Sequence, residues 1–270
     1  IVDTTPFIVW DMRNYQRVYS LDTGDTYSVA WSPDNSQIAI GGLSGLEIIP
    51  ANEDLTRTEI NPYRLIWDLQ IGSVAWNSSG SQLAAAANDG KVYILDTTTH
   101  EQLAVFEAYT EWAYAIAWSP DDGMIAVYGI DGAVTIWDAN TGENLAQYLG
   151  NGGGTVAFSI GFSPYGGRFA YGLSYAGDVN TDLQSDSSAR NLDEGAIQIV
   201  VPVPSLERLQ AIQAACMTAP VAATMDTQAL TLDALPEYMA QVESLTDAQI
   251  PPGCAADLVA VAEALMAQDQ

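Results

Sequence analysis

A short pattern that returns every 42 to 45 residues constrains this chain more than any other feature. It reads AWSP at Ala30, AWNS at Ala75, AWSP at Ala117 and GFSP at Gly161, so the successive spacings are 45, 42 and 44 residues. Between the copies, short β-type runs alternate with turn signals. A period in the low forties that carries four strands is typical of a propeller blade, because one small sheet must stack on its neighbours to bury its faces.

The clearest unit spans residues 112–148. Its runs AIAW, MIAVYG, AVTIWD and NLAQY are separated by Ser-Pro, Asp-Gly and Asn-Thr-Gly turn signals, as antiparallel strands joined by tight turns require. Corresponding runs predict units over 27–60, 71–106 and 156–204, and a third-and-fourth-strand pair over 7–11 and 17–21. In the first unit the fourth strand is expected over 56–60. The aromatic residues that end the first strands are expected in the core: Trp31, Trp76, Trp118 and Phe162.

These repeats resemble the WD40 family over roughly the first 205 residues. The residues that carry the resemblance are the turn aspartates Asp89 and Asp131 and the pairs Trp10-Asp11 and Trp137-Asp138. The resemblance implies a WD40-like β-propeller that acts as a scaffold. His100 is the only histidine and stands in another turn. A buried His-Asp hydrogen-bond network like that of the family is therefore not expected.

The expected fold is all-β, with about four full blades plus a partial one over residues 1–204 and a small α-helical tail over residues 205–270. We expect these four blades and the strand pair to be part of a larger ring, which residues upstream of Ile1 or another chain would complete. The missing strands are expected beside residues 7–11, because an isolated strand pair is marginal in water and a free edge invites pairing. Closure within the chain, against residues 195–201, is the alternative.

Helical spacing replaces strand alternation after Pro204. Leu206, Leu209, Ile212 and Ala215 form an apolar stripe behind a Ser205 cap, although 206–210 also aligns with a fourth strand. Further helices are predicted over 233–245, with Pro236 in the first turn, and from Pro251 onward.

The only two cysteines, Cys216 and Cys254, both fall in this tail. No Cys or His stands nearby to complete a metal site, so a disulfide is the leading interpretation and two buried thiols the alternative. Closing a loop of this size would stabilise the tail by roughly 3 to 4 kcal/mol. A disulfide implies an oxidising compartment and hence export.

The chain carries 34 acidic and 8 basic residues, with a formal net charge of −26. This balance argues against binding nucleic acid or anionic lipid, since both need a basic surface. No apolar run approaches the roughly 18 residues needed to cross a bilayer. The first residue is Ile rather than Met, which is expected where an N-terminal segment has been removed or left out.

An insertion over residues 174–194 is rich in Asp, Asn, Ser and Gly. Asp178, Asn180 and Asp182 alternate as DxNxD, which places three hard oxygen ligands on one side of a loop, as Ca²⁺ requires. The loop lacks the glycine and the final glutamate of an EF-hand. A solvated loop without an ion is the alternative, and no other cofactor is indicated.

The connections between units contain aromatic residues. These connections are expected on the same rim of the propeller as the insertion. The aromatic residues are Tyr63, Trp67, Tyr109, Trp112 and Tyr114. Tyr and Trp supply large contact areas with few rotatable bonds, so these residues are candidates for protein contact. Packing between blades is the alternative for each of them.

The sequence contains no Ser-His-Asp or Cys-His catalytic arrangement and no histidine metal cluster. The Gly-rich stretch from Asn151 to Gly154 precedes a strand rather than a helix, so it lacks the context for binding an anion such as phosphate. We therefore expect a non-catalytic exported module that binds a protein partner or further copies of itself through the propeller rim and the tail. A structural subunit of a cell-surface layer or extracellular filament is one alternative. A propeller hydrolase or a carbohydrate-binding propeller is another.

Overall fold

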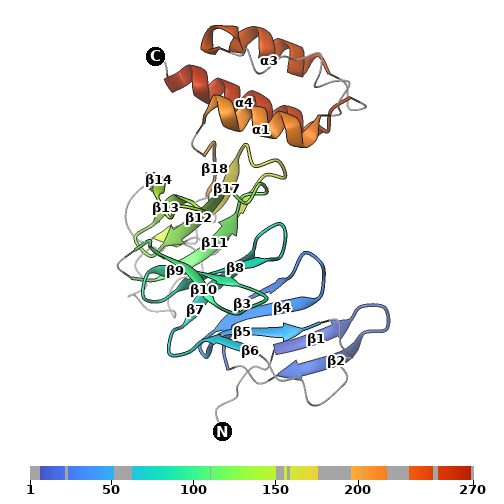
Figure 1. The fold of residues 1–270 in the computed structure, drawn as a ribbon, viewed down its shortest axis with the longest axis vertical. Coiled ribbons are helices and arrows are strands. Elements are labelled where there is room, and N and C mark those ends of the chain that lie inside the picture. Colours follow the sequence, from blue (N-terminus) through green and yellow to red (C-terminus); the bar gives the residue numbers. More distant parts are fainter. Residues whose placement is uncertain are drawn as a thin grey trace, which may run out of the picture.

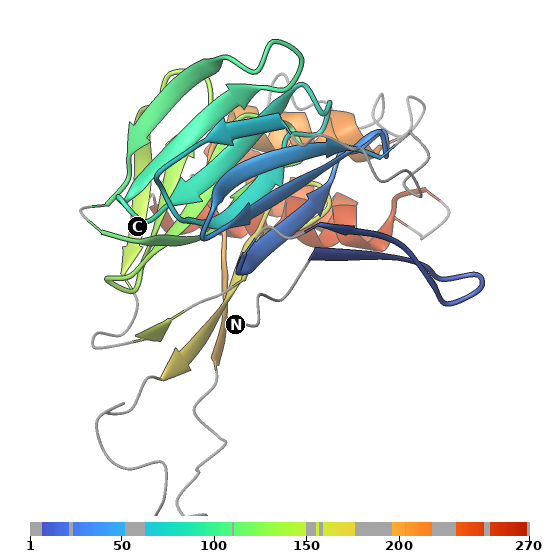
Figure 2. The same cartoon turned by 90° about the horizontal axis from the view of Figure 1, so that it is seen from below.

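A computed structural model describes residues 7–21, 24–51, 63–109, 111–149, 155–156, 159–175, 196–202, 204–217, 231–245 and 249–268. Within these ranges the chain forms a row of four small β-sheets followed by three α-helices, with a strand pair at the opposite end of the row (Figure 1). Turning the molecule shows the sheets stacked face to face, with the helices behind them (Figure 2). This confirms the predicted β-propeller arrangement with a C-terminal helical region, while the domain division at residue 204 stays a prediction.

Three blades have four antiparallel strands in chain order. Blade 1 contains β3 (Thr26–Trp31), β4 (Gln37–Gly42), β5 (Gly45–Pro50) and β6 (Tyr63–Ile66). Blade 2 contains β7 (Ile71–Trp76), β8 (Gln82–Ala87), β9 (Lys91–Asp96) and β10 (Gln102–Glu107). Blade 3 contains β11 (Ala113–Trp118), β12 (Met124–Gly129), β13 (Ala133–Asp138) and β14 (Asn144–Leu149).

Blade 4 and the N-terminal pair are less complete. In blade 4, β17 (Phe169–Tyr175) pairs with β15 (Thr155–Val156), β16 (Ile160–Phe162) and β18 (Ala196–Val200). The N-terminal pair consists of β1 (Phe7–Asp11) and β2 (Gln16–Leu21). Among the described strands β1 pairs with β2 alone, so the ring is not closed by pairing of β1 with β18.

The hydrophobic core lies between the blades. The first strands of consecutive blades are neighbours, in the order β3, β7, β11 and β16. Residues 84–87 of β8 are all alanine and fully buried. Ala84 and Ala86 pack toward blade 3, whereas Ala85 and Ala87 pack toward blade 1. Small side chains on both faces of this strand let the flanking sheets approach closely, as the sequence indicates.

One expected core residue is exposed. Trp118 is buried and Trp76 is partly buried, and each indole packs on the first strand of the preceding blade. Trp31, by contrast, is 49% exposed. Within the described ranges β1 and β2 are the strands that precede blade 1, and no inner strand among them covers the Trp31 ring. The prediction that all four first-strand aromatics lie in the core was wrong for this residue.

The fourth strand of blade 1 lies later than predicted. It is β6, whereas residues 56–60 lie outside the described residues. In the observed register Leu46 opposes Ile66 and Glu47 opposes Arg64, with Arg64 Nε 2.6 Å from a Glu47 carboxylate oxygen. Tyr63 therefore belongs to a strand and not to the connection between blades.

The C-terminal region is helical as predicted, and Leu209 and Ile212 of the predicted stripe are buried, whereas Ala215 is exposed. The helices are α1 (Leu206–Cys216), α3 (Leu235–Glu243), preceded by the short 3₁₀ helix η2 (Leu232–Ala234), and α4 (Pro252–Gln268). The Ser205 hydroxyl accepts the Arg208 backbone N–H at 3.1 Å and caps α1. Cys216 and Cys254 form a disulfide between α1 and α4, with their Cα atoms 5.9 Å apart.

Blade 4 holds the helices through a buried carboxylate. Asp257 of α4 is fully buried and accepts hydrogen bonds from the Ser163 hydroxyl at 2.6 Å, Arg168 Nε at 2.8 Å and the Gly167 N–H at 3.3 Å. Arg208 of α1 donates to the Gly166 carbonyl in the same turn. Its guanidinium also lies 3.6 Å from Asp121 of blade 3. The tail is thus attached to two blades by specific polar contacts.

Candidate functional site

The turn aspartates singled out in the repeats organise the turns between strands. Asp138 accepts the backbone N–H groups of Thr141 at 2.8 Å and Asn140 at 2.9 Å, and these hydrogen bonds lower the pKa of its carboxyl. Asp131 accepts the Ala133 N–H at 3.0 Å. Asp89 accepts the Lys91 N–H at 3.1 Å and the Tyr93 hydroxyl at 2.7 Å. These carboxylates are engaged within their own turns.

The partial blade repeats this arrangement in an exposed setting. Asp11 accepts the Arg13 backbone N–H at 2.9 Å and pairs with its guanidinium at 2.9 Å, which lowers the pKa of the Asp11 carboxyl. Trp10 is exposed, whereas Trp137 stacks on Phe106 of blade 2 with the ring centroids 5.6 Å apart. The difference arises because the described residues include no blade that could cover Trp10.

Tyr109, expected on the interaction rim, is a structural residue of blade 3. Its hydroxyl lies 2.9 Å from the carbonyls of Val127 and Ala133 and 3.1 Å from the Thr135 hydroxyl. Burial raises the pKa of the phenol. A Cβ at Gly129 would lie 2.5 Å from the Tyr109 ring, so the glycine makes room for it. This network ties the connection from blade 2 into blade 3 without a histidine.

Two other predicted rim residues lie in an aromatic cluster, which we define as Tyr27, Trp112 and Tyr114. The Trp112 ring stacks on Tyr114 at a centroid distance of 5.5 Å and tilts toward Tyr27 at 6.5 Å. Trp112 and Tyr114 are half-buried, whereas Tyr27 is exposed. The cluster brings Tyr27 of blade 1 into contact with Trp112 at the start of blade 3. Gly72 of blade 2 lies against the adjacent backbone of blade 3. A Cβ at Gly72 would lie 2.9 Å from the Ala113 carbonyl, so a larger residue would push the blades apart.

Comparison with known proteins identifies the repeats. The model of the family described as WD domain, G-beta repeat matches residues 66–96 and 100–138. These two segments match WD40 repeats. The matches cover β7 to β9 and β10 to β13.

Two known proteins are similar to parts of this chain. Meiotic fizzy-related protein 2 of Schizosaccharomyces pombe is 28% identical over 78 residues, which are 29% of this chain and 15% of that protein. Kuenenia stuttgartiensis Hydrazine Synthase has a similar fold, with a TM-score of 0.52 and 16% identity over 65% of this chain and 46% of that chain. The chain therefore matches only a small part of the first relative and less than half of the second, and the second shows the fold alone.

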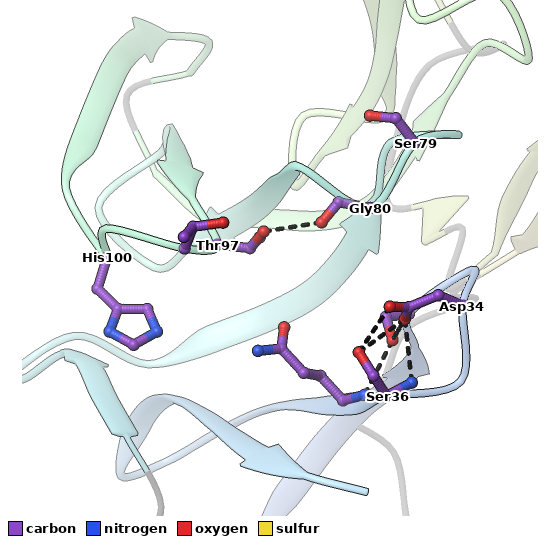
Figure 3. Close-up of a pocket in the computed structure, with 9 residues that line it drawn as sticks. Asp34, Ser36, Ser79, Gly80, Thr97 and His100 are labelled. Carbon is purple, nitrogen blue, oxygen red and sulfur yellow. Dashed lines mark hydrogen bonds between the residues drawn. The ribbon is translucent and has the colours of Figure 1, made fainter. Parts of the chain in front are cut away.

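The blades also form a polar pocket on the turns that join first to second and third to fourth strands (Figure 3). It encloses about 370 Å³ between blades 1 and 2. Its lining consists of Ser32, Asp34, Ser36, Gln37, Ser79, Gly80, Thr97, Thr98 and His100. Sequence reasoning missed this pocket, although serine recurs in the turn after each first strand.

Most polar groups of the pocket already bond to one another. The Asp34 carboxylate accepts the Ser32 hydroxyl at 2.6 Å and both the N–H and the hydroxyl of Ser36. These bonds lower the pKa of Asp34 to about 2, so the carboxylate is a weak base. The Thr97 hydroxyl donates to the Gly80 carbonyl at 2.7 Å. The arrangement stabilises turns and offers no activated nucleophile.

Trp67 remains a candidate contact residue. It is exposed in the connection between β6 and β7, and the Arg64 guanidinium lies 5.8 Å from its ring centroid. Arg64 also pairs with the buried Glu47. Burial raises the pKa of the Glu47 carboxyl, and the charge of Arg64 offsets part of this rise. The ring therefore offers one exposed face beside an ion pair.

Asp178, Asn180 and Asp182 lie outside the described residues, so calcium binding stays a prediction. Across the ranges that the structure describes, no group of three or more His, Cys, Asp or Glu residues is placed to hold a metal ion. In those ranges no helix is both long and apolar enough to span a bilayer.

Proposed function

We propose that this chain is a non-catalytic protein-interaction module that binds a partner polypeptide at the aromatic cluster. The supporting observation is that Tyr27 and Trp112 come from blades far apart in the sequence and meet beside Tyr114 on a partly exposed surface. Aromatic residues held by their neighbours lose little side-chain freedom on binding, which is why such clusters act as hot spots. WD40 propellers generally bind protein partners, and this site fits that role.

The partner of this acidic chain is expected to present an apolar or aromatic anchor with flanking basic residues. The formal net charge of −26 would attract such a segment and raise its association rate. A cationic side chain can also stack on an electron-rich indole. These two effects favour basic segments over acidic ones.

Selection from a random peptide library on the whole chain, with affinities measured by calorimetry, tests the proposal. The double variant Trp112→Ala, Tyr114→Ala should weaken selected peptides at least about tenfold, because hot-spot aromatics contribute roughly 2 kcal/mol or more. Tyr15→Asn is the matched control. It removes an exposed tyrosine from the distant β1–β2 turn, where the backbone φ of 56° suits asparagine. Peptides that bind both variants as well as the wild type would refute the site.

We also propose that the chain works in an oxidising compartment outside the cytosol. The Cys216–Cys254 disulfide and the acidity support this location. Alkylation of the protein in intact cells, followed by mass spectrometry, tests it. Two alkylated cysteines without prior reduction would contradict the proposed location.

A further inference from the structure

One turn of blade 2 carries a side chain that the matching turn of blade 3 lacks. His100 follows β9, and its N–H donates to the Asp96 carbonyl at 3.0 Å. Gly142 takes the same place after β13 and donates to the Asp138 carbonyl at 2.9 Å. Both residues have a left-handed backbone, with φ of 62° and 71°, which suits glycine and costs free energy for other residues. The turn therefore does not require a histidine, and the His100 side chain lines the polar pocket.

The opposite wall of the pocket is a carboxylate with spare hydrogen-bonding capacity. Figure 3 shows Asp34 and Ser36 across the pocket from His100. Asp34 is exposed, and its Oδ1 accepts the Ser32 hydroxyl together with the N–H and the hydroxyl of Ser36. Among the described residues its Oδ2 accepts the Ser36 hydroxyl alone, at 2.8 Å. Each carboxylate oxygen has two lone pairs, so Oδ2 can accept a further hydroxyl from a ligand.

Two further groups on the pocket wall are available to a ligand. Gln37 and Thr98 line the pocket, and their backbone N–H groups donate to the Ser32 hydroxyl and to the Asp96 carboxylate. Within the part of the chain that the structure describes, no hydrogen bond involves the Gln37 amide or the Thr98 hydroxyl. An amide and a hydroxyl each donate and accept. The wall thus combines a pure acceptor, Asp34, with groups that bond in both directions.

The chemistry of the lining excludes several classes of ligand. Among the described residues no large apolar side chain lines the pocket, which disfavours an apolar ligand. No arginine or lysine is among them either, and the pKa of the Asp34 carboxyl is lowered to about 2, so an anion would meet a negative group without a cation. The described ranges place no group of three or more His, Cys, Asp or Glu residues to hold a metal ion. A neutral ligand rich in hydroxyl groups satisfies all these conditions.

We propose that the polar pocket binds one unit of a neutral sugar. A hydroxyl group of the sugar donates to Asp34 Oδ2, and its neighbours exchange hydrogen bonds with Gln37, Thr98 and the His100 imidazole. The volume of about 370 Å³ equals roughly twelve water molecules at about 30 Å³ each, close to the number of carbon and oxygen atoms in one hexose. The pocket follows the first strands, whereas Trp112 of the aromatic cluster precedes β11. The two sites therefore lie at opposite ends of these strands and are independent.

His100 is a reporter whose signals need no assignment, because it is the only histidine. D-Glucose, D-galactose and D-mannose would each be titrated into the full chain, and the His100 ring signals followed in ¹H–¹³C spectra. At least one sugar should shift these signals with one-site saturation. Its dissociation constant should be on the order of a millimolar, because each hydroxyl exchanges bonds to water for bonds to protein at little net gain. The uronate of the same sugar should bind at least about tenfold more weakly, because its carboxylate would face Asp34.

Two variants and a matched control make the test specific. Thr98→Trp should abolish sugar binding by filling the pocket. Asn140→Trp is the control, since Asn140 has the place of Thr98 in the turn after β13, is likewise exposed and likewise donates its backbone N–H to the turn aspartate. His100→Gly, followed in ligand-observed saturation-transfer spectra, should weaken binding about fivefold, the effect of one neutral hydrogen bond. Its thermal unfolding midpoint should equal or exceed that of the wild type, because glycine relieves the left-handed backbone.

The proposal is overturned if none of the three sugars shifts the His100 signals with saturation at high millimolar concentration. It is also overturned if Thr98→Trp binds the sugar as well as Asn140→Trp does, or if His100→Gly binds it as well as the wild type does. A uronate that binds as tightly as its neutral sugar would contradict the assignment to an uncharged ligand. Trp112→Ala, which tests the aromatic cluster, should leave sugar binding intact.

Discussion

Replacing Asp257 by alanine should cost about 3 kcal/mol of unfolding free energy. The carboxylate accepts three hydrogen bonds, one of them in the ion pair with Arg168. Removing one partner of a buried pair typically costs about 3 to 5 kcal/mol, because the other group is left uncompensated. The Arg168 side chain is 33% exposed and can regain water, which places the expected loss at the lower end.

Thermal and urea unfolding of the full chain would measure this loss. For a chain of this size the midpoint should fall by about 6 to 12 °C, at roughly 2 to 4 °C per kcal/mol. Asp257→Asn keeps an acceptor for Ser163 but loses the charge opposite Arg168. Its unfolding midpoint should therefore lie between those of the wild type and Asp257→Ala. Glu263→Ala removes an exposed carboxylate from the same helix and serves as control. An Asp257→Ala variant as stable as the control would refute the reasoning that this contact holds the helices on blade 4.

Three further predictions concern single interactions. Tyr109→Phe should lower the unfolding free energy by about 1 to 2 kcal/mol in urea titrations, because two carbonyls and the Thr135 hydroxyl lose a buried partner; an unchanged midpoint would contradict the structural role. Reduction of the Cys216–Cys254 bond should destabilise the tail by about 4 kcal/mol for a sequence separation of 38 residues, and two thiols alkylated in the unreduced, denatured protein would show that the bond is absent. The pKa of Asp34 is lowered from 3.8 to about 2, so its contribution to stability is present above pH 3.8 and is lost as the pH falls toward 2. Asp34→Asn should therefore flatten the decline of the urea midpoint between pH 4 and 2, and an identical decline in both proteins would count against this assignment.

The blade framework could be predicted because its signals are local. The turn signals and alternating runs specify each strand from neighbouring residues, and the apolar stripe after Ser205 specifies α1 in the same way. The position of β6 could not be predicted similarly. It depends on cross-strand partners, Arg64 against Glu47 and Ile66 against Leu46, that propensity does not include.

Side-chain roles were harder to predict than strands. Tyr109 is of a residue type common at exposed contact surfaces, and its buried role appears only through hydrogen-bond partners 18 to 26 positions away. Trp31 has the same local sequence as Trp118, yet its exposure depends on the neighbouring blade. Asp257 did carry a signal, since it is a single acid within the apolar run AADLVAVA. An isolated carboxylate on a buried helix face requires a polar partner.

The two ends of the row of blades differ, so local unfolding should begin at one end and not at the other. Stacked repeats behave as a linear array in which each unit depends on its own stability and on its nearest neighbours. At one end Arg208 and Asp257 fasten the helices to blades 3 and 4, whereas at the other end β1 and β2 are the described strands that lie beyond blade 1. Fraying should therefore begin at β1 and β2 and advance one blade at a time. Backbone amides of β3 should exchange with solvent before those of β7, and those of β12 and β13 last.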